Sequence, residues 1–206
     1  MKVLLVNGSP REDGCTYTAL SEVASQLEKN GVEAEFFHIG TNPVRGCVSC
    51  LKCRELKKCV FEDDVCNELI EKIAQADGLV VGSPVYYASI NGALSAILDR
   101  VFYSSSERFR HKPASGVVNC RRGGAASAFD RLNKYFTIAQ MPVVSSTYWN
   151  GTHGFKPEDV KKDHEGLQVM RGIGNNMAWL IKAIKNAGPA PDLGEKRMRT
   201  SFPDGK

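Results

Sequence analysis

No hydrophobic run in the sequence approaches the roughly 20 residues that span a bilayer. The apolar stretch Val3–Val6 is also too short for the hydrophobic part of a secretory signal. We therefore expect a cytoplasmic protein that makes no membrane contact. Because thiols are kept reduced in that compartment, the seven cysteines are expected to pack, bind metal or carry redox chemistry rather than form disulfides.

The sequence also lacks a concentration of charge. Its formal net charge of +4 is spread over separate pairs such as Lys57-Lys58 and Arg121-Arg122, without interleaved aromatic residues. This pattern argues against a nucleic-acid partner. The four histidines show no pairing at metal-ligand spacing, and the chain contains no internal repeat. A chain of 206 residues, of which 42% are hydrophobic, suits one α/β core.

Hydrophobic patterning predicts strands that alternate with helices. Four helices are expected after a first helix that carries Leu20 to Leu27. The predicted strands are 3–6, 31–40, 79–81, 115–119 and 142–145, and the four later helices are 63–76, 90–102, 125–139 and 157–184 (starting at Pro157 or Asp163). Such an alternation predicts an open, mostly parallel sheet whose ligand lies at the carboxyl ends of the strands. The loops to consider are 7–18, 82–90 and 119–124.

The first of these loops, NGSPREDGCTYT, has the composition of a phosphate site. Backbone amides at a helix N-terminus attract anions, and Ser9, Arg11, Thr16 and Thr18 add donors. The loop matches neither the Walker A pattern nor G-x-G-x-x-G. It suits a terminal phosphomonoester such as that of FMN. The alternative is a tight turn in which Thr16 only caps the helix.

The second loop, GSPVYYASI, follows a buried strand and places two tyrosines where the ligand crevice opens. Tyr86 and Tyr87 are candidates for contact with a flat ring. The alternative is that both tyrosines are half-buried in the core, which is the more common position of aromatic residues at a strand end. In the third loop, Cys120 could either pack in the core or contact the cofactor, and the sequence favours neither.

A cysteine-rich loop lies between residues 43 and 61. Cys47, Cys50, Cys53 and Cys59 read C-x2-C-x2-C-x5-C, a spacing that can ligate a [4Fe–4S] cluster. A structural zinc ion and a loop without metal remain alternatives. Cys66 falls on the apolar face of the predicted helix 63–76 and is expected to pack.

These residues together resemble the flavodoxin-like FMN reductases that depend on NAD(P)H, the group that includes the iron–sulfur flavoproteins. The matching stretches are GSPREDGCTYTAL, GCVSCLKCRELKKCVFEDD, ADGLVVGSPVYYASINGALSAILDR and CRRGGAASAFDRLNKYF. The resemblance implies a three-layer α/β sandwich with a five-stranded parallel sheet in the order 2-1-3-4-5 and helices on both faces. Residues 1–188 would form this domain, and 189–206 a tail.

The resemblance also implies a site. The residues it assigns to FMN are Ser9, Arg11, Cys15, Thr16 and Thr18 near the phosphate, Pro84, Val85, Tyr86 and Tyr87 along the ring, and Cys120, Arg121, Gly123 and Gly124 at the ring edge. The four loop cysteines would hold a [4Fe–4S] cluster. Two positions depart from the family: Cys15 replaces a usual asparagine, and Ser95 a common lysine. Cys15 removes an amide donor beside the phosphate.

The implied activity is reduction of FMN by NAD(P)H and electron transfer to a small acceptor such as a quinone. One alternative is an iron–sulfur flavoprotein that exchanges single electrons with a ferredoxin. A second alternative, from a different functional class, is a non-enzymatic thiol or zinc module that senses oxidants or binds a partner. No side chain need act in proton transfer, since the flavin carries the chemistry. The resemblance further implies a homodimer or homotetramer.

Overall fold

The computed structural model describes residues 1–192, 194–195 and 198. The predicted tail, 189–206, therefore lies largely outside the described residues. Within the described part of the chain, no helix is long and apolar enough to cross a membrane.

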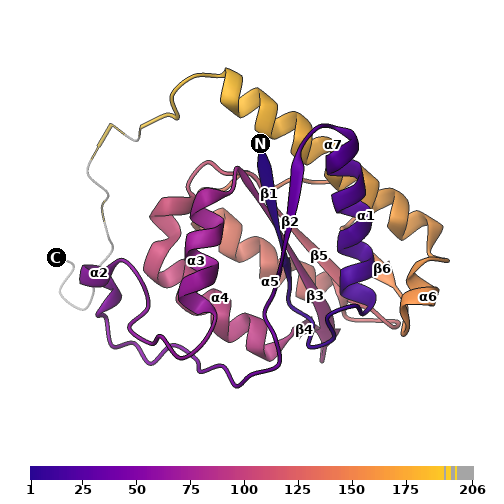
Figure 1. Cartoon of the computed structure of the whole chain (residues 1–206), viewed down its shortest axis with the longest axis horizontal. Coiled ribbons are helices and arrows are strands. Elements are labelled where there is room, and N and C mark those ends of the chain that lie inside the picture. The colour runs from indigo at the N-terminus through magenta and orange to yellow at the C-terminus, as the bar shows by residue number, and fades with distance from the viewer. Residues whose placement is uncertain (193, 196–197, 199–206) are drawn as a thin grey trace.

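A sheet forms the middle layer of the fold (Figure 1). Its strands are β1 (Lys2–Asn7), β2 (Glu33–His38), β3 (Gly78–Tyr86), β4 (Ser89–Ile90), β5 (Ala114–Cys120) and β6 (Gly151–His153). The order is β2-β1-β3-β5-β6 with parallel pairing throughout, while β4 pairs only with β3 and is antiparallel to it. The buried central strands are continuous apolar runs because helices cover both faces.

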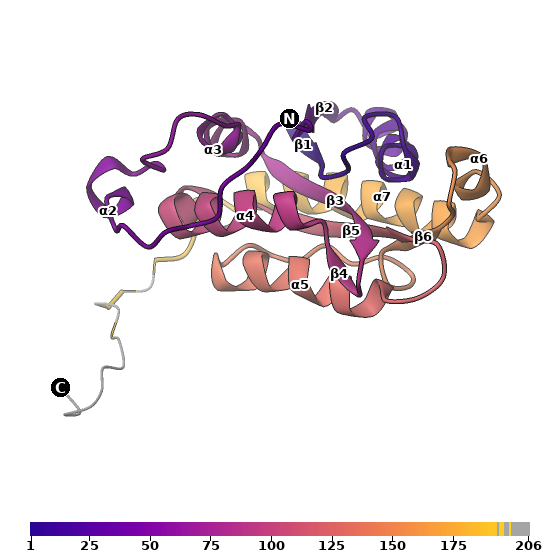
Figure 2. The same ribbon diagram turned by 90° about the horizontal axis from the view of Figure 1, so that it is seen from below.

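Helices form the two outer layers (Figures 1 and 2). They are α1 (Cys15–Lys29), α2 (Cys53–Leu56), α3 (Cys66–Gln75), α4 (Gly92–Ser105), α5 (Ala125–Ile138), α6 (Pro157–Val160) and α7 (His164–Asn186), with a 3-10 turn η1 (Ser106–Phe109). Alternation along β1 divides the core: Val3 and Leu5 pack with α1 and α7, and Leu4 and Val6 pack with α3, α4 and α5. The predicted three-layer α/β fold is confirmed.

The fifth strand is not where the sequence predicts it. Residues 142–145 make an isolated bridge between Val143 and Ala114, and the strand itself, β6, comes later. The Ser115 hydroxyl donates to the Val144 carbonyl at 2.9 Å, and Asn150 Nδ2 donates to that hydroxyl at 2.9 Å. Backbone pairing holds at Ala114, whose amide donates to the Pro142 carbonyl and whose carbonyl accepts from the Val144 amide, and it resumes at Val118, whose amide donates to the Asn150 carbonyl. The observed order is otherwise the predicted one, with β4 as an additional short strand.

Two further predictions need correction. The third strand does not end at Val81, because β3 continues through Gly82, Ser83 and Pro84 to Tyr86 and turns back as β4. Of the two predicted starts of the last helix, Asp163 is confirmed and Pro157 is wrong, because Pro157–Val160 form a separate short helix, α6, and α7 follows Asp163. Asp163 caps α7, since its side chain accepts from the Gly166 amide at 2.9 Å.

Candidate functional site

Three loops converge at the carboxyl edge of the sheet, at the foot of β1, β3 and β5 in Figure 1. The Gly8 amide donates to the Gly82 carbonyl at 2.9 Å. Pro84 pairs with Asn119 one strand further on. The predicted loops after the first, third and fourth main strands therefore meet, as the sequence indicates.

The first loop is held in one shape by its own side chains. Asn7 Nδ2 donates to the Glu12 carbonyl at 2.8 Å, and Asn7 Oδ1 accepts from the Ser9 amide at 3.1 Å. The Ser9 hydroxyl accepts from the Arg11 amide at 3.1 Å. His38 Nε2 lies 2.7 Å from the Ser9 carbonyl oxygen. The loop is thus preorganised ahead of α1. Sequence reasoning missed Asn7 and His38 in this role.

The N-terminus of α1 carries a buried hydroxyl that has no partner among the described residues. Thr16 is 1% exposed, and among the described residues its Oγ1 has no hydrogen-bond partner. The Thr18 hydroxyl, two residues further along the helix, already donates to the Gly14 carbonyl at 3.1 Å. The first amides of an α-helix have no intrahelical acceptor, and the helix dipole favours an anion beside them.

The five residues predicted near the phosphate lie in the first loop and the first turn of α1, but they are not equivalent. Ser9 is buried and engaged within the loop, whereas Arg11 is exposed and its guanidinium reaches solvent. Thr16 offers an unused hydroxyl, within the part of the chain that is described. Cys15 is half-buried, with Sγ 3.7 Å from the Gly154 carbonyl oxygen. Burial raises the pKa of this thiol, which favours its neutral form.

The second loop is a strained hairpin. Tyr87 and Ala88 join β3 to β4 with φ values of 49° and 58°, the backbone of a type I′ turn that normally uses Asn and Gly. Non-glycine residues in this region cost on the order of 1–2 kcal/mol each. The turn presents Tyr87 fully exposed and Tyr86 half-exposed. Such strain is typical of ligand-binding positions.

The third loop packs against that hairpin. Gly124 has φ +85°, and a Cβ there would lie 2.8 Å from Ala88 Cα. Gly124 therefore permits the close approach of the two loops. Arg121 and Gly123 are exposed at the rim, while Cys120 is buried at the end of β5. Burial raises the pKa of the Cys120 thiol.

A cavity of about 300 Å³ adjoins the third loop. Its lining includes Arg122, Phe129, Tyr148, Trp149 and His153. The Tyr148 and Trp149 rings are 5.4 Å apart and largely exposed. An aromatic wall with a cation at its rim suits a flat, polar-edged molecule.

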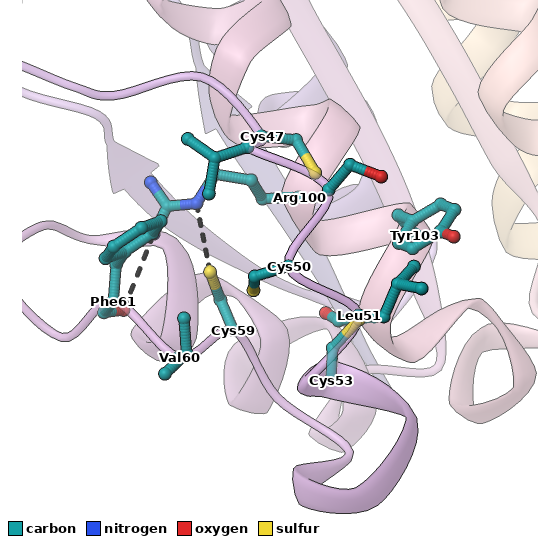
Figure 3. A pocket seen from close by; sticks show the side chains of 12 residues that line it. Cys47, Cys50, Leu51, Cys53, Cys59, Val60, Phe61, Arg100 and Tyr103 are labelled. Carbon is teal, nitrogen blue, oxygen red and sulfur yellow. Dashed lines mark hydrogen bonds between the residues drawn. The ribbon is translucent and has the colours of Figure 1, made fainter.

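The cysteine loop lies apart from the strand ends. Its four cysteines line one pocket together with Phe61, Arg100 and Tyr103 (Figure 3). Cys47 and Cys50 are exposed, Cys53 is half-buried and Cys59 is buried. Across the described residues, no three His, Cys, Asp or Glu side chains are grouped closely enough to hold a metal ion.

The backbone of this loop is also unusual. Ser49, Leu51 and Lys57 have φ values of 54°, 60° and 55°, a region that residues with a Cβ rarely adopt. These positions alternate with the cysteines, and the Lys57 carbonyl accepts from the Ser105 hydroxyl of α4 at 3.1 Å. Burial raises the pKa of the Cys53 thiol. Burial likewise raises the pKa of Cys66, to about 12, and this residue packs in the core as predicted.

Arg100 is a pocket residue that sequence reasoning missed. It lies on α4, three residues after Ile97 and next to Val101, both of which are fully buried. The helical period thus places a cation on an apolar face, a pattern that is visible in the sequence and marks Arg100 as unusual. Arg100 is eight residues beyond Gly92, about 12 Å along the helix at 1.5 Å per residue. The cysteine pocket, which Arg100 lines, therefore lies about two turns of α4 away from the start of this helix, next to β4.

Residues 1–156 match the sequence profile of a family described as NADPH-dependent FMN reductase. An iron–sulfur flavoprotein of Methanocaldococcus jannaschii is 32% identical over 193 residues, which cover 90% of this chain and 100% of that protein.

Two solved structures share the fold. RosB with bound 8-demethyl-8-formylriboflavin-5′-phosphate superposes with a TM-score of 0.71 at 16% identity, covering 98% of this chain and 93% of that one. A flavodoxin from the domain Archaea gives a TM-score of 0.61 at 15% identity, covering 88% and 99%.

Proposed function

Because the chain belongs to the NADPH-dependent FMN reductase family, we propose that FMN binds at the carboxyl edge of the sheet, with its phosphate at the N-terminus of α1. Family membership makes the protein an FMN-dependent oxidoreductase and sets aside the non-enzymatic thiol module. The observation that carries the placement is the Thr16 hydroxyl, which is buried and lacks a partner within the described residues. A phosphate oxygen would satisfy it together with the free amides of α1.

The ring would lie against the hairpin. Tyr86 and Tyr87 offer exposed aromatic faces, and the close contact of Gly124 with Ala88 fixes the hairpin relative to the third loop. Bound FMN supplies electron exchange in steps of one or two at its ring. The chain's own residues bind the phosphate, orient the ring and set its surroundings. Arg121 and Gly123 are proposed to face the ring edge, and Cys120 to support them from the core.

The test of this proposal is flavin content and turnover. The purified full chain should be yellow, release one FMN per chain on denaturation and oxidise NADPH or NADH in the presence of an acceptor. A colourless protein that fails to bind added FMN would contradict the proposal. Relative rates with the two nucleotides identify the preferred donor.

We further propose that Cys47, Cys50, Cys53 and Cys59 ligate a [4Fe–4S] cluster. Four thiols around one pocket are the donor set of such a centre, and the M. jannaschii relative is named an iron–sulfur flavoprotein. A cluster supplies single-electron exchange with a carrier such as ferredoxin. The exposed turns between the cysteines would have to draw the thiols together. Iron and acid-labile sulfide after anaerobic purification test this, and a Cys59→Ser variant should lose both while retaining FMN.

The acceptor distinguishes two modes of action. If electrons pass through the cysteine loop, a reduced ferredoxin should exchange with the protein. If they pass directly from FMN to a small molecule, the cavity beside Arg122 is the proposed acceptor site, because Phe129, Tyr148 and Trp149 suit a quinone ring. A Trp149→Ala variant should then raise KM for the quinone and leave exchange with ferredoxin unchanged. An unchanged KM would contradict the placement.

We also propose that the protein is a homodimer or homotetramer. The exposed rings of Tyr148, Trp149 and Trp179 support an assembly, because aromatic side chains are enriched in protein interfaces. Light scattering of the FMN-loaded protein measures the mass directly, and a monomer at micromolar concentration would overturn the proposal.

A further inference from the structure

Arg100 is a buried cation on the side of α4 that faces the cysteine loop. Its side chain is 1% exposed, and the Asp64 carboxylate with which it pairs is 4% exposed. An isolated buried guanidinium would be very costly, so the pair offsets the loss of hydration. Arginine does not lose its proton in proteins, and Arg100 therefore brings a permanent set of donors to this pocket.

The terminal nitrogens of Arg100 hold both ends of the cysteine loop. Nη1 donates to the Arg45 carbonyl at 3.2 Å as well as to Asp64, and Nη2 donates to the Phe61 carbonyl at 3.4 Å. Arg45 precedes the first cysteine of the loop, and Phe61 follows the last. The planar fork of one side chain thus fixes the entry and exit of the whole segment.

A further donor of Arg100 reaches a sulfur atom. Nε lies 3.1 Å from Cys59 Sγ, a contact drawn as a dashed line in Figure 3. Asn67 fixes the main chain of Cys59 from the other side, accepting from its amide at 2.9 Å and donating to its carbonyl at 3.0 Å. Cys59 is buried, whereas Cys47 and Cys50 are exposed. Cys59 is therefore the fixed sulfur of the loop.

The contact with sulfur goes beyond holding the loop. The contacts of Nη1 and Nη2 would suffice for a purely structural clamp. An N–H directed at sulfur gains strength as the sulfur becomes more negative. Hydrogen bonds to the sulfurs are among the features that set the reduction potential of a cluster. Since reduction adds an electron, a donor at a ligand sulfur favours the reduced state.

We propose that Arg100 is a positioning residue of the iron–sulfur centre: it fixes Cys59 for ligation and, through its Nε–H, shifts the cluster toward the reduced state. This inference rests on the cysteine assignment proposed above. Asp64 takes part by balancing the charge of Arg100, so the donor acts without adding net charge to the pocket. No contact of Arg100 with the FMN site is required.

The test compares Arg100→Lys with Arg108→Lys. Lysine keeps the positive charge opposite Asp64 but has no donor at the Nε position. Arg108 pairs with Glu71 at the surface and controls for the exchange of arginine for lysine. A double variant, Arg100→Met with Asp64→Asn, removes both charges together and avoids a buried unpaired carboxylate. Each full-length protein is purified anaerobically, and FMN, iron, sulfide and the midpoint potential of the cluster are measured.

We expect Arg100→Lys to retain FMN and to lower the ratio of reduced to oxidised cluster at a fixed potential about tenfold, which is about 59 mV for one electron. Selective loss of iron with FMN retained also supports the positioning role. If Arg100→Lys does not fold, as judged by FMN content, the double variant must show the shift.

Potential and iron content equal to those of Arg108→Lys would overturn the inference alone. Wild-type protein with FMN but without iron would overturn it together with the cluster. Absence of FMN would instead reject the flavin site, so the three failures are distinguishable.

Discussion

Replacing Thr16 by valine separates the phosphate site from the stability of the fold. The two side chains have nearly the same shape, and the change removes the buried Oγ1 that has no partner in the described part of the chain. A hydrogen bond to a charged group contributes about 1.5–3 kcal/mol. The Kd for FMN should therefore rise about 10- to 150-fold.

The same substitution should have the opposite effect on the protein without FMN. A buried hydroxyl that makes no hydrogen bond costs about 1–3 kcal/mol. Thr16→Val removes this cost, so the free energy of unfolding of the FMN-free protein should increase. Only a ligand-binding role predicts greater stability with weaker binding. A Thr16 that merely capped the helix would lose stability on substitution.

FMN-free protein is titrated with FMN, and binding is monitored through the quenching of flavin fluorescence. The free energy of unfolding is measured separately by urea unfolding without FMN. Thr18→Val is the matched control, because the Thr18 hydroxyl already donates to the Gly14 carbonyl within the same helix. It should reduce stability slightly and change the Kd much less. An unchanged Kd in Thr16→Val, or an equal loss in both variants, would refute the reasoning.

Three further changes test the fold. Gly8→Ala places a Cβ 2.8 Å from the Gly82 carbonyl oxygen. Urea unfolding should therefore show a free energy of unfolding lower by about 1–3 kcal/mol, and FMN binding should be weaker. Gln140→Gly should stabilise the protein by about 1 kcal/mol and raise Tm, because Gln140 follows α5 at φ +57°. Burial and a 2.5 Å hydrogen bond to Asp99 raise the pKa of Tyr135 to about 12. Stability present below pH 10 should fall as the pH rises from 10 toward 12, and unfolding of a Tyr135→Phe variant should lack this component.

Each of these has a clear contrary result. Normal stability of Gly8→Ala would mean that the strand-end contact is looser than the structure indicates. A lower Tm for Gln140→Gly would remove the argument from left-handed backbone. An alkaline loss that is the same in wild type and Tyr135→Phe would show that other groups titrate there.

The local patterns in the sequence carried much of the fold. Apolar residues at helical spacing in α1, α3 and α5, and short buried strands at β1 and β5, are properties of neighbouring residues. The position of β6 was predicted wrongly because it depends on contacts between residues that lie far apart in the sequence. Residues 142–145 look like a strand, but they make only an isolated bridge, and the Val144 carbonyl is bound by the side chains of Ser115 and Asn150, which lie outside that stretch.

The candidate site divides in the same way. Its loops could be located from their composition, and the cysteine spacing is visible without any structure. The hairpin at Tyr87 and Ala88 could not be predicted, because neither residue is typical of a type I′ turn. Composition also does not say which hydroxyl of the first loop is free.

What the sequence determined by itself is the set of local preferences: periodicity, turn composition, and cysteines that lie close along the chain. The tertiary structure decided which groups meet across long separations, as Arg100 does with Cys59, 41 residues earlier. It also decided that Thr16 is buried with its hydroxyl unused by the described residues. The physical reason is that burial and hydrogen-bond satisfaction depend on every segment packed around a group, whereas periodicity depends only on its neighbours in the chain.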